Sequence, residues 1–273
     1  MKLPSIRYYH VDHVLSGDGG TAMVYWGVDL RSGYPVAIKQ LYASRTRSVD
    51  LRSEANRYLY LSHPNLTKLV DFVVEGDQCF LIMEFVEGMT LDKYQSTRTG
   101  PMPDHVALPI FLQLLDTIAY LHQNDTLHLD IKPNNVMIQE DGKIKVLDMG
   151  ISAKIKNGGI HTKVCGTPAY MPPEQSERGV LGRYTDIFAL GVTLYVMLTA
   201  HMPFSGNNQN EIWRNVKMGK YTPPRAYYPY VNPMLEPIIH KALQAMPEAR
   251  YQSCEEMAQD IRKVMSIKNN INH

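Results

Sequence analysis

The sequence predicts an α+β fold of two lobes, a small strand-rich lobe in residues 1–86 and a larger, mostly helical lobe in residues 87–273. Up to about residue 85, short runs rich in Val, Tyr and Ile alternate with turns that contain glycine, which is typical of strands. After residue 88, apolar residues recur at helical spacing over long segments. The length of 273 residues fits such a two-lobed chain.

The strand-rich lobe contains one helical pattern, in residues 50–61, and His63-Pro64-Asn65 ends it. We therefore expect a small sheet accompanied by one long helix. Residues 85–88 are expected to form the hinge to the second lobe.

The second lobe has its strongest helical pattern in residues 107–122, and another in residues 186–198. The uncharged stretch 187–200 is shorter than the roughly 20 residues that span a bilayer, so we expect a buried core helix there. Further helices are predicted at residues 210–218, 235–245 and 254–265. Ser253 and Glu256 have the spacing of a capping box for the last of these.

Composition excludes several classes of protein. With 28 Lys and Arg against 27 Asp and Glu, the charge gives no indication of nucleic-acid binding. Cys79, Cys165 and Cys254 lie far apart and form no C-x-x-C pair, so neither a disulfide framework nor a zinc site is indicated. The N-terminal residues lack the apolar segment of a signal peptide. We expect a cytoplasmic protein with no membrane segment; its oligomeric state stays open.

Residues 17–24 place several glycines between two strand patterns. Backbone without side chains can close over phosphate groups there, although a tight hairpin alone has the same composition.

The strand pattern at residues 36–39 places Ala37 and Lys39 on one face, because strand side chains alternate with period two. A lysine on an inward face needs an anion, and the small Ala37 leaves room for a flat ring. Glu54 is the candidate carboxylate that would hold the Lys39 ammonium. Taken separately, each charged residue also fits a solvent-exposed position.

The loop at residues 128–135 carries the strongest signal. Asp130, Lys132 and Asn135 offer a proton acceptor, a phosphate clamp and a metal ligand within one loop. Farther along, Asp148-Met149-Gly150 adds a second carboxylate before a flexible glycine. Two carboxylates and one amide oxygen suit magnesium.

These motifs, in this order, resemble the protein kinase family over nearly the whole chain. The resemblance extends to residues 166–175 and 186–191, and is greatest to the bacterial, eukaryotic-like Ser/Thr kinases. It implies a bilobal kinase fold with an antiparallel sheet in the small lobe. It also implies ATP and magnesium as cofactors and proteins with Ser/Thr acceptors as substrates.

By this resemblance, Lys39 would bind the α- and β-phosphates and pair with Glu54. Asp130 would accept the proton of the substrate hydroxyl. Lys132 would steady the γ-phosphate, and a lysine here is the pattern of Ser/Thr kinases.

The same resemblance assigns the nucleotide and metal sites. Asn135 and Asp148 would hold magnesium. The nucleotide pocket would be formed by Leu15, Gly17, Gly19, Val24, Ala37, Lys39, Met83, Glu84, Val86 and Met137.

Three further positions resemble the scaffolding of the family. Glu174 would pair with Arg250, and Asp186 would cap the backbone of the catalytic loop. Thr167 is expected to hydrogen-bond near Asp130 and Lys132.

Leu129 departs from the family pattern, since arginine usually precedes the catalytic aspartate in kinases that need a phosphorylated activation loop. We hypothesise that the enzyme is active without that phosphorylation, although Thr162 is a possible site. Ala22 and Met149 also depart from the pattern, but a small residue and a flexible apolar one fit their positions.

Two alternatives remain. A pseudokinase would act as a nucleotide-binding scaffold, but such proteins usually lose a motif residue, and Lys39, Asp130, Asn135 and Asp148 are all present. A small-molecule kinase of similar fold is disfavoured by residues 166–174, which resemble a peptide-docking activation segment.

Overall fold

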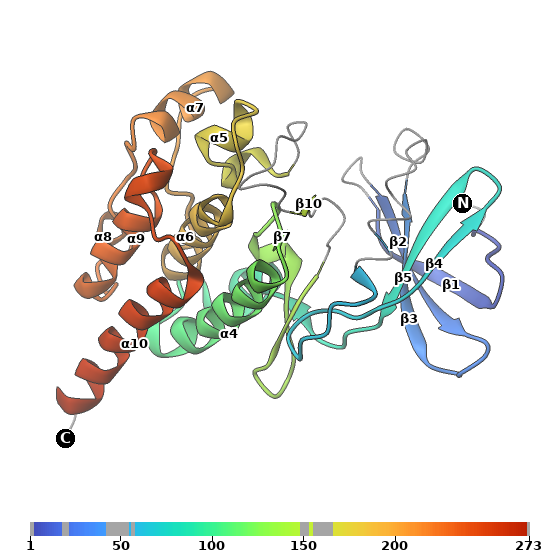
Figure 1. Ribbon diagram of the computed structural model, residues 1–273. Helices are drawn as coiled ribbons and strands as arrows, with labels where there is room; N and C mark the ends of the chain where they lie inside the picture. Colours follow the sequence, from blue (N-terminus) through green and yellow to red (C-terminus); the bar gives the residue numbers. More distant parts are fainter. Residues whose placement is uncertain are drawn as a thin grey trace. The chain divides into compact units, whose positions relative to one another are not determined.

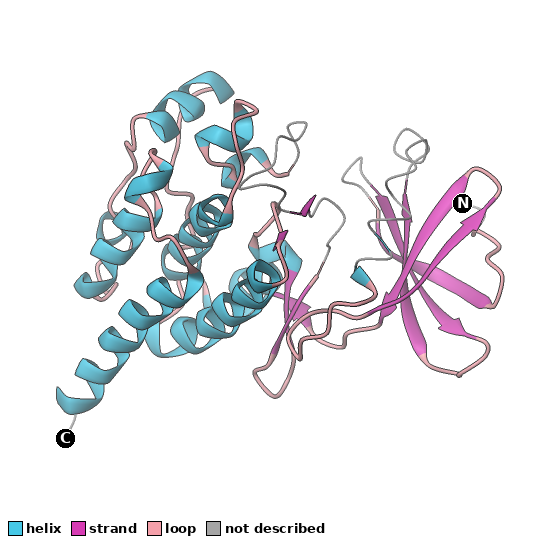
Figure 2. Cartoon of the chain, viewed as in Figure 1, coloured by secondary structure: helices cyan, strands magenta, loops and turns pink. Residues whose placement is uncertain are grey.

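The computed structural model describes residues 3–17, 22–41, 55, 58–147, 153–154 and 166–271, with the backbone alone at 22, 153–154 and 268–271. The chain divides into two compact units, Met1–Glu87 and Gly88–His273 (Figure 1). Strands dominate the first unit and helices the second (Figure 2). The predicted α+β fold is confirmed.

The first unit is built on a five-stranded antiparallel sheet with the order β1-β2-β3-β5-β4. Its strands are β1 (Tyr9–Ser16), β2 (Ala22–Asp29), β3 (Pro35–Leu41), β4 (Leu69–Glu75) and β5 (Gln78–Glu84). Since β3 pairs with β5, the chain between β3 and β4 leads to the edge of the sheet. The helix predicted at residues 50–61 falls in this connection and lies mostly outside the described residues, but Ala55 and Tyr58 are helical and buried.

The side chains of this sheet alternate between two faces, as expected for strands. One face packs against the N-terminal segment in a core whose buried members are Ile6, Tyr9, Val11, Met23, Tyr25, Val36, Ile38, Phe80 and Ile82. The core therefore uses only one set of alternate residues, and the other set is left to form a second face.

The second unit consists mainly of helices and short strands. The helices are α3 (Leu91–Tyr94), α4 (Asp104–Gln123), α5 (Pro173–Ser176), α6 (Arg183–Thr199), α7 (Gln209–Lys217), α8 (Pro224–Tyr227), α9 (Glu236–Ala242) and α10 (Cys254–Ile271). The strands are β6 (Met89–Thr90), β7 (Thr126–Leu127), β8 (Val136–Ile138), β9 (Ile144–Val146) and β10 (Ala153–Lys154).

All five helices predicted for this unit are confirmed, as α4, α6, α7, α9 and α10. The short helices α3, α5 and α8 were not predicted, because four residues are too few to show a periodic pattern. Both α5 and α8 begin with proline in the first turn, where its missing N–H costs nothing. That proline is the one local signal the sequence offers for them.

The capping box predicted for α10 is only partly right. The Ser253 hydroxyl accepts from the backbone N–H of Glu256 at 3.2 Å, as expected. The Glu256 carboxylate, however, accepts from the N–H of Gln252 at 3.1 Å and so reaches one residue beyond the predicted partner. Both contacts still satisfy N–H groups at the start of the helix.

Helix α4 is long and apolar enough to cross a membrane, as judged by length and composition among the described residues. In the fold, however, 61% of its apolar window is buried inside the protein. Core helices share these properties, so α4 is weak support for a membrane span.

Helix α6 is the buried core helix expected at residues 186–198, and it approaches α9 closely. A β-carbon added at Gly191 would lie 2.7 Å from Cβ of Ala242 and 3.3 Å from Cδ2 of Leu243. Since β-carbons do not approach so closely, glycine at this position sets the spacing of the two helices.

We predict that Gly191→Ala destabilises the protein, although alanine is the better helix former. Overpacking should lower the free energy of unfolding by about 1–3 kcal/mol, more than the gain in helix propensity of about 1 kcal/mol. Urea unfolding measures the change. Adding Ala242→Gly to this variant should recover part of the loss, and a Gly191→Ala protein at least as stable as the wild type would contradict the packing argument.

Candidate active site

The loop at residues 128–135 is held at both ends by short strands of the second unit. It follows β7 and leads through the 3-10 turn Pro133–Asn135 into β8. The central strand β8 pairs with β6 on one side and β9 on the other. The N–H of Leu147 also donates to the carbonyl oxygen of Asn135 at 2.8 Å. The end of the loop is therefore tied to the residue that follows β9.

The Asp130 carboxylate accepts bonds from several directions. Its Oδ1 accepts from the N–H of Thr167 at 2.9 Å and from the Thr167 hydroxyl at 2.8 Å. Its Oδ2 accepts from Nδ2 of Asn135 at 3.0 Å and lies 2.9 Å from Nζ of Lys132. The side chain is 13% exposed. The carboxylate is thus fixed in orientation and still reachable from solvent.

Thr167 links the two charged groups of the loop. Nζ of Lys132 donates to the Thr167 hydroxyl at 2.6 Å, and that hydroxyl donates its own hydrogen to Asp130. One hydroxyl can accept and donate at once, so both bonds form together. The predicted position of Thr167 beside Asp130 and Lys132 is confirmed.

The amide of Asn135 is oriented by the backbone and side chain of Asp130. Its Nδ2 donates to the carbonyl oxygen of Asp130 at 2.8 Å and to Oδ2 of the same residue. With the nitrogen so occupied, Oδ1 is the amide atom that remains as a metal ligand. An amide oxygen next to a carboxylate fits the oxygen ligands that magnesium prefers. The predicted second ligand, Asp148, lies outside the described residues.

Asp186, at the start of α6, fixes the backbone at the start of the loop. Its Oδ2 accepts from the N–H of His128 and its Oδ1 from the N–H of Leu129, each at 2.9 Å. Leu129 has φ +65, a left-handed conformation that costs a residue other than glycine roughly 1–2 kcal/mol. The predicted capping of the catalytic loop by Asp186 is confirmed, and it stabilises this backbone conformation.

The carboxylate of Asp186 is fully buried, and His122 donates to it from a distance of 2.8 Å. Burial alone would raise the pKa of Asp186. The hydrogen bond from His122 and the N–H of His128 outweigh burial and lower that pKa below its ordinary value. The buried group is therefore an ionised acceptor.

The other side of Leu129 is held by the segment at residues 166–175. Nε2 of Gln175 donates to the carbonyl oxygen of Leu129 at 2.9 Å. Gly166 has φ +109, and a β-carbon there would lie 2.7 Å from the same oxygen. Glycine is thus required at position 166, where the segment passes against the loop.

Tyr170 is a residue of this site that sequence reasoning did not single out. Burial, followed by the charges of Asp92 and Asp130, raises the pKa of its hydroxyl above the usual value. The phenol therefore keeps its proton. Nothing in the local sequence distinguishes it from other loop tyrosines, because its burial arises only in the fold.

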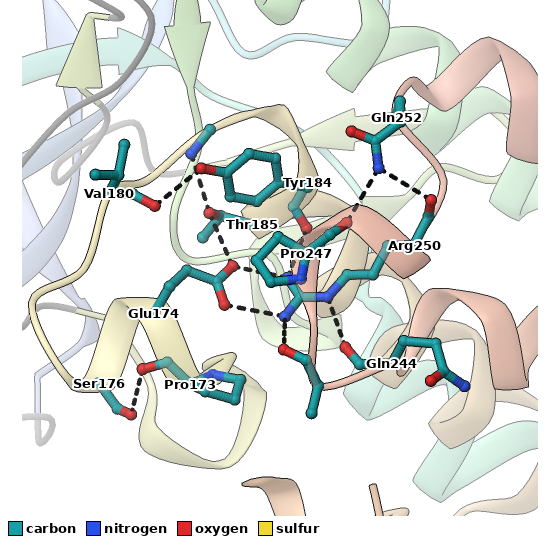
Figure 3. Close-up of polar contacts among 12 residues, drawn as sticks. Pro173, Glu174, Ser176, Val180, Tyr184, Thr185, Gln244, Pro247, Arg250 and Gln252 are labelled. Atoms are coloured by element: carbon teal, nitrogen blue, oxygen red, sulfur yellow. Dashed lines mark hydrogen bonds and ion pairs between the residues drawn. The ribbon is translucent and has the colours of Figure 1, made fainter.

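The predicted pair of Glu174 and Arg250 is confirmed as a two-pronged ion pair (Figure 3). Nη1 and Nη2 of Arg250 donate to the two carboxylate oxygens at 2.7 and 2.9 Å. The remaining N–H groups donate to the backbone carbonyls of Tyr184, Gln244 and Ala245. All five guanidinium hydrogens have acceptors, as a fully buried arginine requires.

The nucleotide-binding residues predicted in the sheet share the face opposite the apolar core. Lys39 lies opposite Val24 on β2, and Ala37 lies opposite Met83 on β5. Lys39 is only 8% exposed, so most of its side chain is buried. Within the first unit, the fold brings Val24, Ala37, Lys39 and Met83 together.

The other nucleotide-binding residues predicted in this unit lie at strand ends. Leu15, near the end of β1, is exposed, and Gly17 follows the strand, where an added β-carbon would meet the flexible end of the Met23 side chain. Glu84 ends β5, where its N–H donates to the carbonyl of Lys68, and Val86 is buried just after it.

Three predicted site residues lie outside the described residues, namely Gly19, Glu54 and Asp148. Met137 belongs to the second unit. It is half-buried on β8, opposite Thr90 and Lys145.

The protein kinase domain family matches residues 9–261 of this sequence, which covers the sheet, the loop at 128–135 and most of the helices. The chain belongs to this family.

Among curated proteins, the chain is 37% identical to serine/threonine-protein kinase PrkC of Bacillus subtilis over 260 residues, 93% of this chain and 40% of PrkC. It is 32% identical to serine/threonine-protein kinase PknB of Mycobacterium leprae, over 94% of this chain and 43% of PknB. It is also 32% identical to CBL-interacting protein kinase 26 of rice (Oryza sativa), over 86% of this chain and 48% of that kinase. The predicted resemblance to bacterial Ser/Thr kinases is confirmed. The chain spans less than half the length of these relatives.

We predict that Asp186→Asn weakens the fold and changes its acid sensitivity. Losing one partner of a buried charged network should lower the free energy of unfolding by about 3–5 kcal/mol. The folded pKa of Asp186 lies below the unfolded value of about 3.9, so the unfolded chain binds more protons between the two values. The wild-type contribution is complete above the unfolded pKa and is lost as the pH falls through the folded pKa.

Urea unfolding at a series of pH values tests this prediction. The variant should show less loss of stability on acidification than the wild type. Equal dependence on pH in the two proteins would mean that Asp186 does not supply this stabilisation.

Proposed function

We propose that this protein is a Ser/Thr protein kinase that transfers the γ-phosphoryl group of Mg-ATP to protein hydroxyls. The observation that carries the proposal is the oriented carboxylate of Asp130, with the ammonium of Lys132 beside it. Membership of the protein kinase domain family, and relatives named as Ser/Thr kinases, support it.

In this proposal, Asp130 accepts the proton of the substrate hydroxyl while the hydroxyl oxygen forms its bond to phosphorus. The bond from phosphorus to the leaving oxygen of ADP breaks in the same transfer. Such reactions depend mainly on positioning and charge neutralisation. Asp130 fits this role because Thr167 and Asn135 already hold both of its oxygens in place.

Lys132 supplies positive charge next to the proton acceptor. Its Nζ is held between Asp130 and the Thr167 hydroxyl, and its side chain is 20% exposed. From there it would contact the phosphoryl group as the charge on its oxygens redistributes. Thr167 positions both charged groups and takes no proton itself.

The nucleotide would be bound by the face of the sheet that carries Val24, Ala37 and Lys39. The small Ala37 leaves space for the purine, and Lys39 provides the positive charge for the phosphates. Asn135 and Asp148 would hold magnesium, which neutralises phosphate charge when bound.

A second candidate function is a pseudokinase that binds nucleotide as a scaffold without transferring phosphate. The complete hydrogen bonding of Asp130, Lys132 and Asn135 favours catalysis over this alternative. Nucleotide binding without any phosphoryl transfer would favour the pseudokinase scaffold over the active kinase.

We also propose a cytoplasmic location and protein partners that carry Ser or Thr acceptors. The two cysteines among the described residues, Cys79 and Cys254, are not in disulfides, which fits a reducing compartment. The near-neutral charge supports the proposal that nucleic acid is not a partner.

We predict that Asp130→Asn removes phosphoryl transfer while leaving the fold intact. Loss of a general base should lower the rate about 100-fold or more. Phosphate from Mg-ATP is followed on the protein itself and on a mixed protein extract, with mass spectrometry to locate phosphoserine and phosphothreonine. The matched control is Asp141→Asn, an exposed aspartate paired with Lys143 in a turn, which should retain wild-type activity. Unchanged transfer in Asp130→Asn would exclude the assigned role.

We further propose that activity does not require phosphorylation of the activation loop, because Leu129 stands where a charged arginine would need a phosphate partner. The Leu129 side chain is apolar and 3% exposed. Thr162, the hydroxyl considered for such phosphorylation, lies outside the described residues.

Phosphatase treatment tests this independence. The treated wild type, confirmed by mass spectrometry to carry no phosphate, should phosphorylate an added substrate at most of its initial rate. Thr162→Ala should behave in the same way, since no phosphate on that residue is needed. Loss of all activity on treatment, restored by renewed phosphorylation, would sink the idea.

A further inference from the structure

Three buried side chains from three helices meet behind the catalytic loop. His122 lies in the last turn of α4, Asp186 in the first turn of α6, and Cys254 is the first residue of α10. Nε2 of His122 is 2.8 Å from Oδ2 of Asp186, and Nδ1 of His122 is 3.9 Å from Sγ of Cys254. The exposed fractions of His122, Asp186 and Cys254 are 3%, 0% and 0%. The three side chains are therefore shielded from bulk solvent.

The ionised state of Asp186 determines which nitrogen of His122 carries a hydrogen. A carboxylate can only accept, so the nitrogen that faces it must be the donor. Nε2 of His122 is therefore an N–H group. In a neutral imidazole, Nδ1 is then the bare nitrogen, which can only accept.

A bare ring nitrogen that is buried needs a donor. Among the described residues, the sulfur of Cys254 lies 3.9 Å from Nδ1, and a thiol donates weakly. Burial, with the negative charges of Asp186 and Glu255, raises the pKa of this thiol well above its usual value. The thiol hydrogen is thus present to be donated.

The charged groups around the three side chains are compatible with this arrangement. On α6, Arg183 donates to the backbone carbonyl of His122 at 3.0 Å, away from the ring. On α10, the carboxylate of Glu255 accepts from the side chain of Gln123 at 3.1 Å. On the loop side, Nδ1 of His128 accepts from the N–H of Asp130. None of these contacts supplies a donor to Nδ1 of His122.

We propose that His122 is neutral and that Cys254 is a positioning residue of the kinase: its thiol donates to Nδ1 of His122 and so stabilises the tautomer whose Nε2–H donates to Asp186. Asp186 in turn holds the N–H groups of residues 128 and 129, directly before the catalytic Asp130. The start of α10 thereby contributes to the geometry of the active site without contacting substrate. The effect on catalysis rests on the proposed kinase function, but the tautomer does not.

Nitrogen-15 NMR of the full chain with labelled histidine tests the tautomer directly. In the wild type, His122 should show a protonated Nε2 and a hydrogen-bonded, unprotonated Nδ1. Cys254→Ser keeps a donor and should keep this pattern. Cys254→Val keeps an apolar side chain without a donor, so Nδ1 should shift to the position of a bare nitrogen or become protonated.

Cys79→Val is the matched control, because it replaces the other described buried cysteine, on β5 in the first unit. It should leave the His122 signals unchanged. A wild-type His122 with hydrogen on Nδ1, or the same Nδ1 signal in Cys254→Val as in the wild type, would overturn the proposal. The wild-type spectrum decides even if a variant fails to fold.

Kinetics in the same proteins test the consequence for catalysis. A lost weak hydrogen bond should lower kcat about twofold to tenfold in Cys254→Val, with little change in KM for ATP, and Cys254→Ser should restore most of it. In a His122→Gln background, the amide donates to Asp186 without needing a tautomer, so adding Cys254→Val should have no further effect. An equal loss in both backgrounds would show that the change acts through packing alone. If no protein transfers phosphate, the proposed function fails while the NMR result still stands.

Discussion

The buried carboxylate of Asp186 is the interaction on which the active-site loop depends. It satisfies two consecutive backbone N–H groups and takes a third bond from His122, and the side chain is not exposed to solvent. These bonds stabilise the left-handed conformation of Leu129, directly before Asp130. Helix α6 is buried along most of its length, so it is expected to resist local opening. The bonds from Asp186 attach the loop to this helix.

Two aspartates of the same unit therefore serve opposite purposes, set by their surroundings. Asp186 is surrounded by hydrogen-bond donors and is fully buried, so its charge serves to bind the backbone N–H groups of residues 128 and 129. Asp130 has comparable hydrogen bonding, but its side chain remains partly exposed and lies beside an ammonium. In the proposed function, Asp130 exchanges a proton with substrate and needs this access, whereas a group that only orients the chain is more effective when it is buried.

The local sequence pattern predicted the main helices and strands and the motif residues. It could not predict the contacts between residues that are distant in the chain. The shared face of Ala37 and Lys39 follows from strand alternation alone, and the long helices follow from their apolar spacing. The raised pKa of the Tyr170 hydroxyl could not be predicted, because it comes mainly from burial in the folded protein. The contact of Cys254 with His122 could not be predicted either, because it joins helices that are far apart in the chain. The bond from the N–H of Gln252 to the Glu256 carboxylate depends on a side-chain rotamer that the sequence does not specify.

The hydrogen bonds of Arg250 affect how the second unit unfolds. Its hydrogen bonds join Glu174, 76 positions earlier, to backbone carbonyls in the start of α6 and the turn after α9. If any one of these segments detached, a buried guanidinium would be left with hydrogens that have neither protein nor water as acceptor, which is costly. Partly opened forms are thereby disfavoured relative to both the native and the fully unfolded chain, so this arginine makes the loss of structure cooperative across segments that the sequence keeps far apart.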